Sequence, residues 1–210
     1  TEIGKFPKRL APISRRPQLT DLKTAISFKE IADQLDRLNL SIYTPSVFIY
    51  DSAKDGYELN LEGSGITIDG REKGLRKLMA TNLLKRLESS VNSFRLTITR
   101  IKDYIESTIR TINNYEKIGG SEMMVAESVE SYDLDSQDSE SDPFVGRQSN
   151  IDLRDMDYVR WRIDLKADLQ VFNSLLEMLR NITPEHDSKL QMLIGDLKYK
   201  FAHPINGENK

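Results

Sequence analysis

The fold is decided by residues 84–115, which read LKRLESSVNSFRLTITRIKDYIESTIRTINNY. Steps of three and four alternate between the apolar or bulky residues of this stretch, which are Leu84, Leu87, Val91, Phe94, Ile98, Ile101, Ile105, Thr108, Ile112 and Tyr115. This spacing keeps side chains on one side of an α-helix and is typical of helices that pack along one another. A strand alternates at every second residue and does not fit it. The stretch therefore predicts a long helix with an apolar seam.

This helix is expected to begin near Arg71 and to end near Ile118, before a Gly-Gly pair, which makes it about 70 Å long. Ser89 and Ser90 inside it are small enough to admit a neighbouring backbone closely. A rod of this kind must bury its seam. A second helix from about Leu153 to Arg180 supplies a partner, with an apolar stripe of Met156, Val159, Ile163, Leu165, Leu169, Phe172, Leu176 and Leu179. The predicted fold class is all-α: a long, coiled-coil-like antiparallel helical hairpin with shorter helices at its base.

Six segments follow from the local signals. Residues 1–26 are basic and contain prolines, which favours an extended chain. Residues 27–70 combine a short helix, opened by the capping box Ser27-Phe28-Lys29-Glu30, with an apolar cluster around Pro45 and a loop that has a possible small β-hairpin at 57–61 and 66–68. The others are the long helix at 71–118, an acidic flexible linker at 119–150, the second long helix at 151–182, and a final helix at 183–210 that opens with Pro184 at its first position.

The charge is unevenly distributed along the 210 residues, although its total is only −3. Residues 1–118 carry twenty Lys and Arg against fifteen Asp and Glu, whereas residues 119–142 carry eight acids and no base. A nucleic-acid face is therefore expected in the first half. The chain has no cysteine and no apolar stretch that could span a membrane, so we expect a cytoplasmic protein without a membrane partner. Its start at Thr1, without Met, indicates a piece of a longer chain.

Catalytic signals are missing from the sequence. There is no G-x-x-x-x-G-K-[ST] phosphate loop, and the glycines at 63, 65 and 70 lie among acids. His186 and His203 stand alone, without the spacing of a metal site or a catalytic pair. We therefore expect no catalytic residue, no metal site and no cofactor in these 210 residues.

Six basic residues at the start of the long helix are the candidate functional residues: Arg71, Lys73, Arg76, Lys77, Lys85 and Arg86. Such an array can neutralise a phosphate backbone and release its condensed counterions. The alternative is a solvated helix surface on which these residues pair with acids of neighbouring helices. Trp161, between Arg160 and Arg162, could stack on a base, but a single Trp on an amphipathic helix is more often a core residue.

Three stretches resemble the helical region between the two motor lobes of bacterial Swi/Snf-class helicase-like ATPases of superfamily two. The first is Lys5-Phe6-Pro7-Lys8-Arg9 leading to Tyr43-x-Pro45, similar to the run that leaves the first lobe. The most specific begins at Gly74-Leu75-Arg76, continues through Leu83-Leu84-Lys85-Arg86-Leu87-Glu88-Ser89-Ser90 and ends at Phe94. The third, Asp187-Ser188-Lys189-Leu190 with Leu193, is similar to the helix that enters the second lobe.

The resemblance implies that the parent chain is an ATP-dependent helicase or DNA translocase that uses ATP and Mg. The piece would then be a non-catalytic module whose partners are the motor lobes of the same chain and duplex DNA, and the octet 83–90 would be a structural motif. The ATP-binding motifs themselves are absent here. The alternative is a helical-hairpin adaptor that binds a partner protein through its coiled-coil faces and does not touch nucleic acid.

Overall fold

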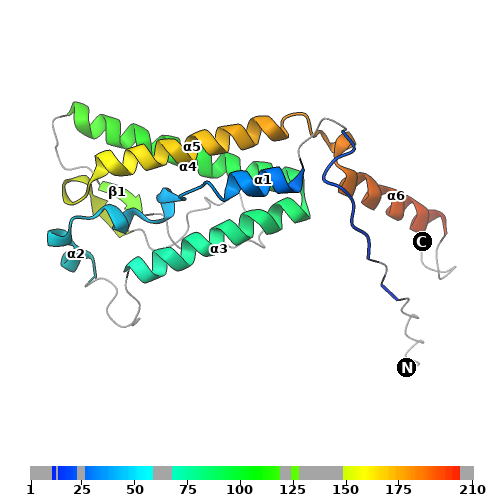
Figure 1. Ribbon diagram of the computed structural model, residues 1–210, viewed down its shortest axis with the longest axis horizontal. Coiled ribbons are helices and arrows are strands. Elements are labelled where there is room, and N and C mark those ends of the chain that lie inside the picture. Colours follow the sequence, from blue (N-terminus) through cyan, green and yellow to red (C-terminus); the bar gives the residue numbers. More distant parts are fainter. Residues whose placement is uncertain are drawn as a thin grey trace, which may run out of the picture. The chain divides into compact units, whose positions relative to one another are not determined.

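The computed structural model describes residues 11–12, 14–22, 27–58, 68–118, 124–127 and 149–203. The chain forms two compact units. The first consists of Thr1–Lys23 with Ile182–Lys210, and the second of Thr24–Asn181. The described part is mostly helical, which confirms the all-α class. The second unit contains α1 (Phe28–Leu35), α2 (Asp51–Glu58), α3 (Ile68–Ser89), α4 (Val91–Lys117) and α5 (Tyr158–Leu179), and Figure 1 shows the three longest side by side.

Helix α4 holds most of the predicted seam. All seam positions from Val91 to Tyr115 are buried, and Leu87 at the end of α3 is buried as well. Leu84 is half-buried. The alternating steps of three and four therefore identified the core side of this helix correctly.

The prediction of a single helix at 71–118 is wrong, because the helix is interrupted at Ser90. This residue has an extended backbone (φ −159°, ψ 129°), and its hydroxyl accepts the N–H of Ser93 at 3.3 Å, which caps α4. The two halves pack against each other instead of continuing in line (Figure 1). A serine hydroxyl stabilises the start of a helix rather than its interior. Folding back also lets α3 and α4 bury their apolar sides on each other.

Helices α4 and α5 are antiparallel, as predicted. Arg95 near the start of α4 donates Nη2–H to the carbonyl of Leu179 at the end of α5, at 2.8 Å. At the opposite end, Arg162 donates Nη1–H to Asn113 at 3.1 Å. The predicted stripe is wrong at its second and third residues, Val159 and Ile163, which are 44% and 61% exposed, whereas its first residue, Met156, is buried. The buried residues of α5 are Trp161, Leu165, Asp168, Phe172, Leu175 and Leu179.

The predicted capping box opens α1: the Ser27 hydroxyl accepts the N–H of Glu30, and the Glu30 carboxylate accepts the N–H of Ser27. The apolar cluster that follows includes two 3₁₀ turns, η1 (Ser41–Tyr43) and η2 (Pro45–Phe48), which contact both α3 and α5. This segment fills the space between two helices that have few direct contacts with each other.

The loop and hairpin predicted for residues 51–70 are partly wrong. Residues 51–58 form α2 and residues 68–70 already belong to α3; the rest of that prediction, 59–67, lies outside the described residues. Two short strands occur later in the chain, where β1 (Met124–Glu127) pairs antiparallel with β2 (Ser149–Asp152), and η4 (Leu153–Asp155) follows directly. Residues 124–127 and 149–150 of the segment predicted as a linker thus belong to strands, and its other residues lie outside the described residues.

The first unit contains η5 (Pro184–His186) and α6 (Ser188–Ala202), with part of the N-terminal segment beside them. The described N-terminal residues are not helical, as their prolines predicted. Thr20 forms an antiparallel bridge with Asp187, and Arg15 pairs with Asp196 at 2.7 Å. The final helix does not begin at Pro184. Its N-cap is Asp187, whose carboxylate accepts the N–H of Leu190 at 2.9 Å, whereas Thr183, the residue before Pro184, makes no side-chain cap bond.

Candidate nucleic-acid interface

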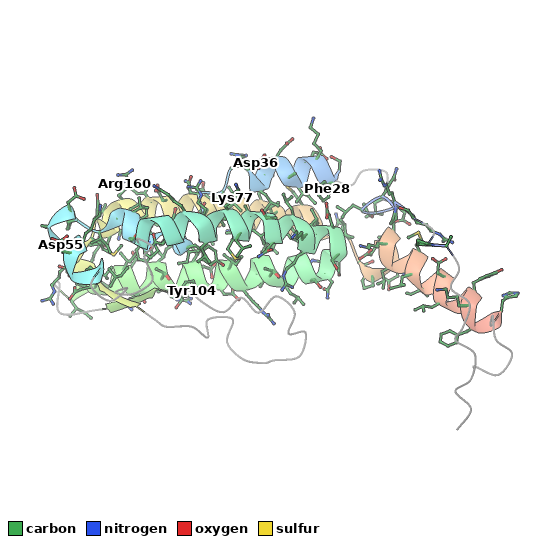
Figure 2. The ribbon with its side chains drawn as sticks, turned by 90° about the horizontal axis from the view of Figure 1, so that it is seen from below. Phe28, Asp36, Asp55, Lys77, Tyr104 and Arg160 are labelled. Carbon is green, nitrogen blue, oxygen red and sulfur yellow. The ribbon has the colours of Figure 1, made fainter. Side chains whose placement is uncertain are left out.

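The outward face of α3 carries the predicted cations. One side of this helix is buried through Glu72, Met79, Leu83 and Leu87. Exposed side chains cover the other side, among them Lys73, Lys77 and Lys85, which we call the lysine row. Figure 2 marks Lys77 on this helix. The row follows an i, i+4, i+12 spacing, with the exposed Thr81 at the missing position.

The lysine row has dimensions that suit a nucleic-acid backbone. Four residues of helix rise about 6 Å, so Lys73 and Lys85 are about 18 Å apart along the axis. One strand of duplex DNA presents a charge every 3.4 Å of its axis, and the row therefore extends over about five phosphates. Because the helix turns about 100° per residue, the row winds about a third of the way around α3 between Lys73 and Lys85, and the long, flexible lysine side chains can still reach one strand.

The other three predicted cations, Arg71, Arg76 and Arg86, differ in their exposure. Arg76 is exposed, one residue before Lys77. Arg86 is half-buried and has its Nε nitrogen enclosed. The backbone of Arg71 belongs to the first turns of α3, while its side chain lies outside the described residues. The structure thus places Lys73, Arg76, Lys77 and Lys85 at the surface and Arg86 partly inside the unit.

Glu72 fixes the N-terminal part of α3 from behind. Its side chain is fully buried and accepts the backbone N–H of Ser46 at 3.0 Å and the Ser46 hydroxyl at 2.5 Å. Ser46 belongs to η2. Hydrogen bonds to a carboxylate are stronger than those between neutral groups. The turn of α3 that presents Lys73, Arg76 and Lys77 is therefore tied to the interior of the unit.

Asp168 of α5 binds the segment that contains η1 and η2, to which Glu72 is also bonded. Its carboxylate accepts the backbone N–H groups of Asn39 at 2.7 Å and Ser41 at 2.8 Å. Leu40 between them has a left-handed backbone (φ 53°), a conformation that this pair of bonds stabilises. Burial raises the pKa of the Asp168 carboxyl, and the backbone N–H groups offset part of the shift. Trp161 adds a bond from Nε1–H to the Ser41 carbonyl at 2.9 Å, which confirms Trp161 as a core residue.

The octet 83–90 of the predicted family motif lies at the junction of α3 and α4. Leu83 and Leu87 are buried, whereas Lys85, Glu88 and Ser89 are exposed. The predicted close approach at Ser89 and Ser90 inside a continuous helix is wrong, because α3 ends at Ser89 and Ser90 caps α4. The motif therefore contains the reversal of the chain as well as one cation of the lysine row.

The outward face of α5 differs from that of α3. Val159, Ile163, Ala167, Gln170, Asn173 and Ser174 are exposed and uncharged. Among the described residues of α5, the exposed charged side chains are those of Arg160, Lys166 and Glu177. A surface with few charges and some exposed aliphatic side chains resembles the centre of a protein interface more than a nucleic-acid contact.

Among the described residues, no group of three His, Cys, Asp or Glu side chains is placed to bind a metal ion. Within the same residues, every helix is too short or too polar to cross a membrane. In the first unit, His186 lies with Nδ1 3.0 Å from the Asp21 carboxylate, next to the bridge between Thr20 and Asp187. This pair joins the N-terminal segment to η5.

Comparison of the chain with protein-family models, with curated proteins and with solved structures gives no match.

Sequence reasoning missed two of the buried carboxylates, Glu72 and Asp168, neither of which is among the predicted site residues. A signal for Asp168 exists, since it lies between Leu165, Phe172 and Leu175 on the buried side of α5. An acid at a seam position indicates a buried acceptor that needs donors from another segment. Ser46, the donor to Glu72, has no comparable signal.

Proposed function

We propose that the chain is a non-catalytic helical module of a nucleic-acid motor, and that it contacts the backbone of duplex DNA through the lysine row. In the longer chain it would lie between the two motor lobes, which bind ATP and Mg, and would couple their movement to the nucleic acid. The observation that carries the proposal is the line of exposed lysines on a helix that Glu72 fixes from behind. The resemblance to the inter-lobe region of helicase-like ATPases supports it.

The charges around the row favour a polyanion. In the described part of the chain, Lys77 and Lys85 form no ion pair with another residue. Glu88, in the last turn of α3, is an exposed acid on the same face. Glu72 is near the row in sequence but points to the interior, where it accepts hydrogen bonds from Ser46. The outward field of the helix is therefore positive at its surface.

The packing of α3 suits the coupling role. This helix packs on α4, and α4 packs on α5 along its length. Arg95 and Arg162 connect the two ends of the α4 and α5 pair. A load applied to α3 by a bound duplex would be shared by three helices rather than by one exposed rod.

The test is a binding measurement with a labelled 20-base-pair duplex and the whole chain at low salt. Replacing Lys73, Lys77 and Lys85 by Ala should weaken binding at least about tenfold, because each lysine contributes to counterion release. The matched control replaces Arg110, Lys117 and Lys166, which are exposed on α4 and α5, and changes the net charge equally. Equal losses in both variants would reduce the effect to net charge, and no binding by the unchanged chain would contradict the proposal.

The second candidate function is a protein-binding adaptor, and the outward face of α5 favours it. Val159 and Ile163 are exposed although they continue an apolar pattern. If the chain does not bind duplex DNA at any salt concentration, and if Ile163→Glu abolishes the capture of a defined partner while Lys77→Glu does not, the adaptor account replaces the motor account.

A further inference from the structure

Helix α6 presents an apolar row that is largely exposed among the described residues of the first unit. Leu190, Leu193, Ile194, Leu197 and Phe201 lie on one side of this helix, at steps of three and four. Leu193, Leu197 and Phe201 are 54%, 45% and 78% exposed. None of the fifteen residues of α6 is buried. A helix of this length gains most of its stability from the packing of an apolar face, which predicts that another surface covers this row.

The charges beside the row are positive. Lys189, Lys198 and Lys200 are exposed on α6. The Asp196 carboxylate is already paired with Arg15 at 2.7 Å, and Asp187 is buried as the N-cap. A surface with complementary charge would therefore carry acids around its own apolar centre. A second copy of α6 would bring lysines against lysines, so self-pairing is disfavoured.

The shape of the row favours a helix as the occupant. Four of its five residues are aliphatic, and their spacing is that of a seam between two helices. A helix that lies on a membrane has a broad apolar face, whereas the apolar residues of α6 form a narrow stripe between lysines. Binding of single-stranded nucleic acid needs aromatic side chains along the groove, and Phe201 is the one aromatic residue in the row.

We propose that α6 is a docking site for an acidic amphipathic helix of a partner protein. The partner inserts apolar side chains between Leu193, Leu197 and Phe201, and its flanking acids pair with Lys198 and Lys200. This interaction is separate from the lysine row of α3 and does not require nucleic acid.

The experiment measures binding of the whole chain to two labelled 21-residue peptides. Both have Leu at the a and d positions of a heptad; one has Glu at e and g, and the other has Lys there. The Glu peptide should bind at least about tenfold more tightly than the Lys peptide. The double variant Leu197→Ser with Phe201→Ser should lose this binding. The control, Leu78→Ser with Leu96→Ser, changes two residues of the second unit that are each 51% exposed and should bind as the unchanged chain does.

A charge exchange makes the test more specific. Replacing Lys198 and Lys200 by Glu should reverse the preference, so that the Lys peptide binds more tightly. Equal binding of both peptides, no binding of the Glu peptide, or an unaltered preference in the exchanged variant would each overturn the proposal. Vesicles with 30% phosphatidylserine and a single-stranded 20-mer serve as further probes, and tighter binding of either one, lost in the Leu197 and Phe201 variant, would replace the helix by that ligand.

Discussion

Helices α4 and α6 have the same kind of apolar repeat, but the repeat is buried in α4 and exposed in α6. The repeat of α4 is buried from Val91 to Tyr115, because α3 and α5 pack on either side of it. The repeat of α6 ends in Phe201, which is 78% exposed. The apolar pattern predicts that one side of the helix will be buried. Which segment packs on that side depends on parts of the chain that are far away in the sequence. One helix thus explains how the second unit is held together, and the other indicates a surface for a partner.

The largest expected effect contrasts the two phenylalanines. Phe94→Ala should lower the free energy of unfolding by about 3–5 kcal/mol, because Phe94 is fully buried and its removal leaves a cavity. Phe201→Ala should change the free energy by less than about 0.5 kcal/mol, as is usual at the surface. Urea denaturation followed by circular dichroism measures both. Similar losses for the two variants would show that α6 is covered in the unbound chain.

A second, smaller effect is expected at Asp168, a buried carboxylate of the second unit. Asp168→Asn should cost about 1–3 kcal/mol near neutral pH, because one of the two backbone N–H groups loses its acceptor. The raised pKa of this carboxyl means that the folded state binds the proton more readily than the unfolded state. The part of its stability contribution that depends on protonation is therefore fully present below the ordinary value of 3.8 and is lost as pH rises through the folded-state pKa, while the two hydrogen bonds to Asn39 and Ser41 remain.

The pH dependence checks that sign. The advantage of the unchanged chain over Asp168→Asn should grow as pH is lowered from neutrality towards 4, measured by urea titrations at several pH values. An advantage that shrinks on acidification would mean that the carboxylate is stabilised in its charged form by the Asn39 and Ser41 amides.

A smaller effect tests the start of α4. Ser90→Ala should cost about 1 kcal/mol, because the N-cap bond to the N–H of Ser93 is lost. Ser89→Ala, one residue earlier and exposed, is the control and should change stability by less than about 0.5 kcal/mol. If residues 71–118 formed one continuous helix, alanine would be the better helix former at both positions and Ser90→Ala would stabilise the protein.

The smallest effect on stability is expected at the lysine row. Replacing Lys77 or Lys85 by Ala should change the free energy of unfolding by less than about 0.5 kcal/mol, because both side chains are exposed. Thermal denaturation measures this. A larger loss would indicate that the row supports the fold, and a loss of DNA binding in these variants could then not be assigned to direct contact.

Local signals predicted much of this fold. The capping box at Ser27, the seam of α4 and the second long helix follow from side-chain spacing and short-range hydrogen bonds. The break at Ser90 was missed because Leu83, Leu87, Val91 and Phe94 all face the same core, so the repeat continues across the turn. The exposure of Val159 and Ile163 was missed because α5 has more apolar residues than its neighbours can cover.

The sequence predicted which cations belong to the candidate site, but it did not predict which of them are exposed on one surface. The sequence shows six basic residues near one another, but the packing of α3 decides that Lys73, Lys77 and Lys85 line up outside while Arg86 is half-buried. The fixation of that helix depends on Glu72 and Ser46, which are 26 residues apart in the chain. Such a pair has no short-range pattern, and it becomes visible once the segment between α3 and α5 is folded.

The salt dependence of duplex binding tests the central proposal most directly. The dissociation constant of the whole chain for a 20-base-pair duplex would be measured between about 50 and 200 mM salt, for the unchanged chain and for the variant with Lys73, Lys77 and Lys85 replaced by Ala. The account predicts a steep slope of log affinity against log salt that becomes shallower by about 2–3 in the variant, since each lost phosphate contact contributes about 0.9. The same slope in both proteins would contradict it.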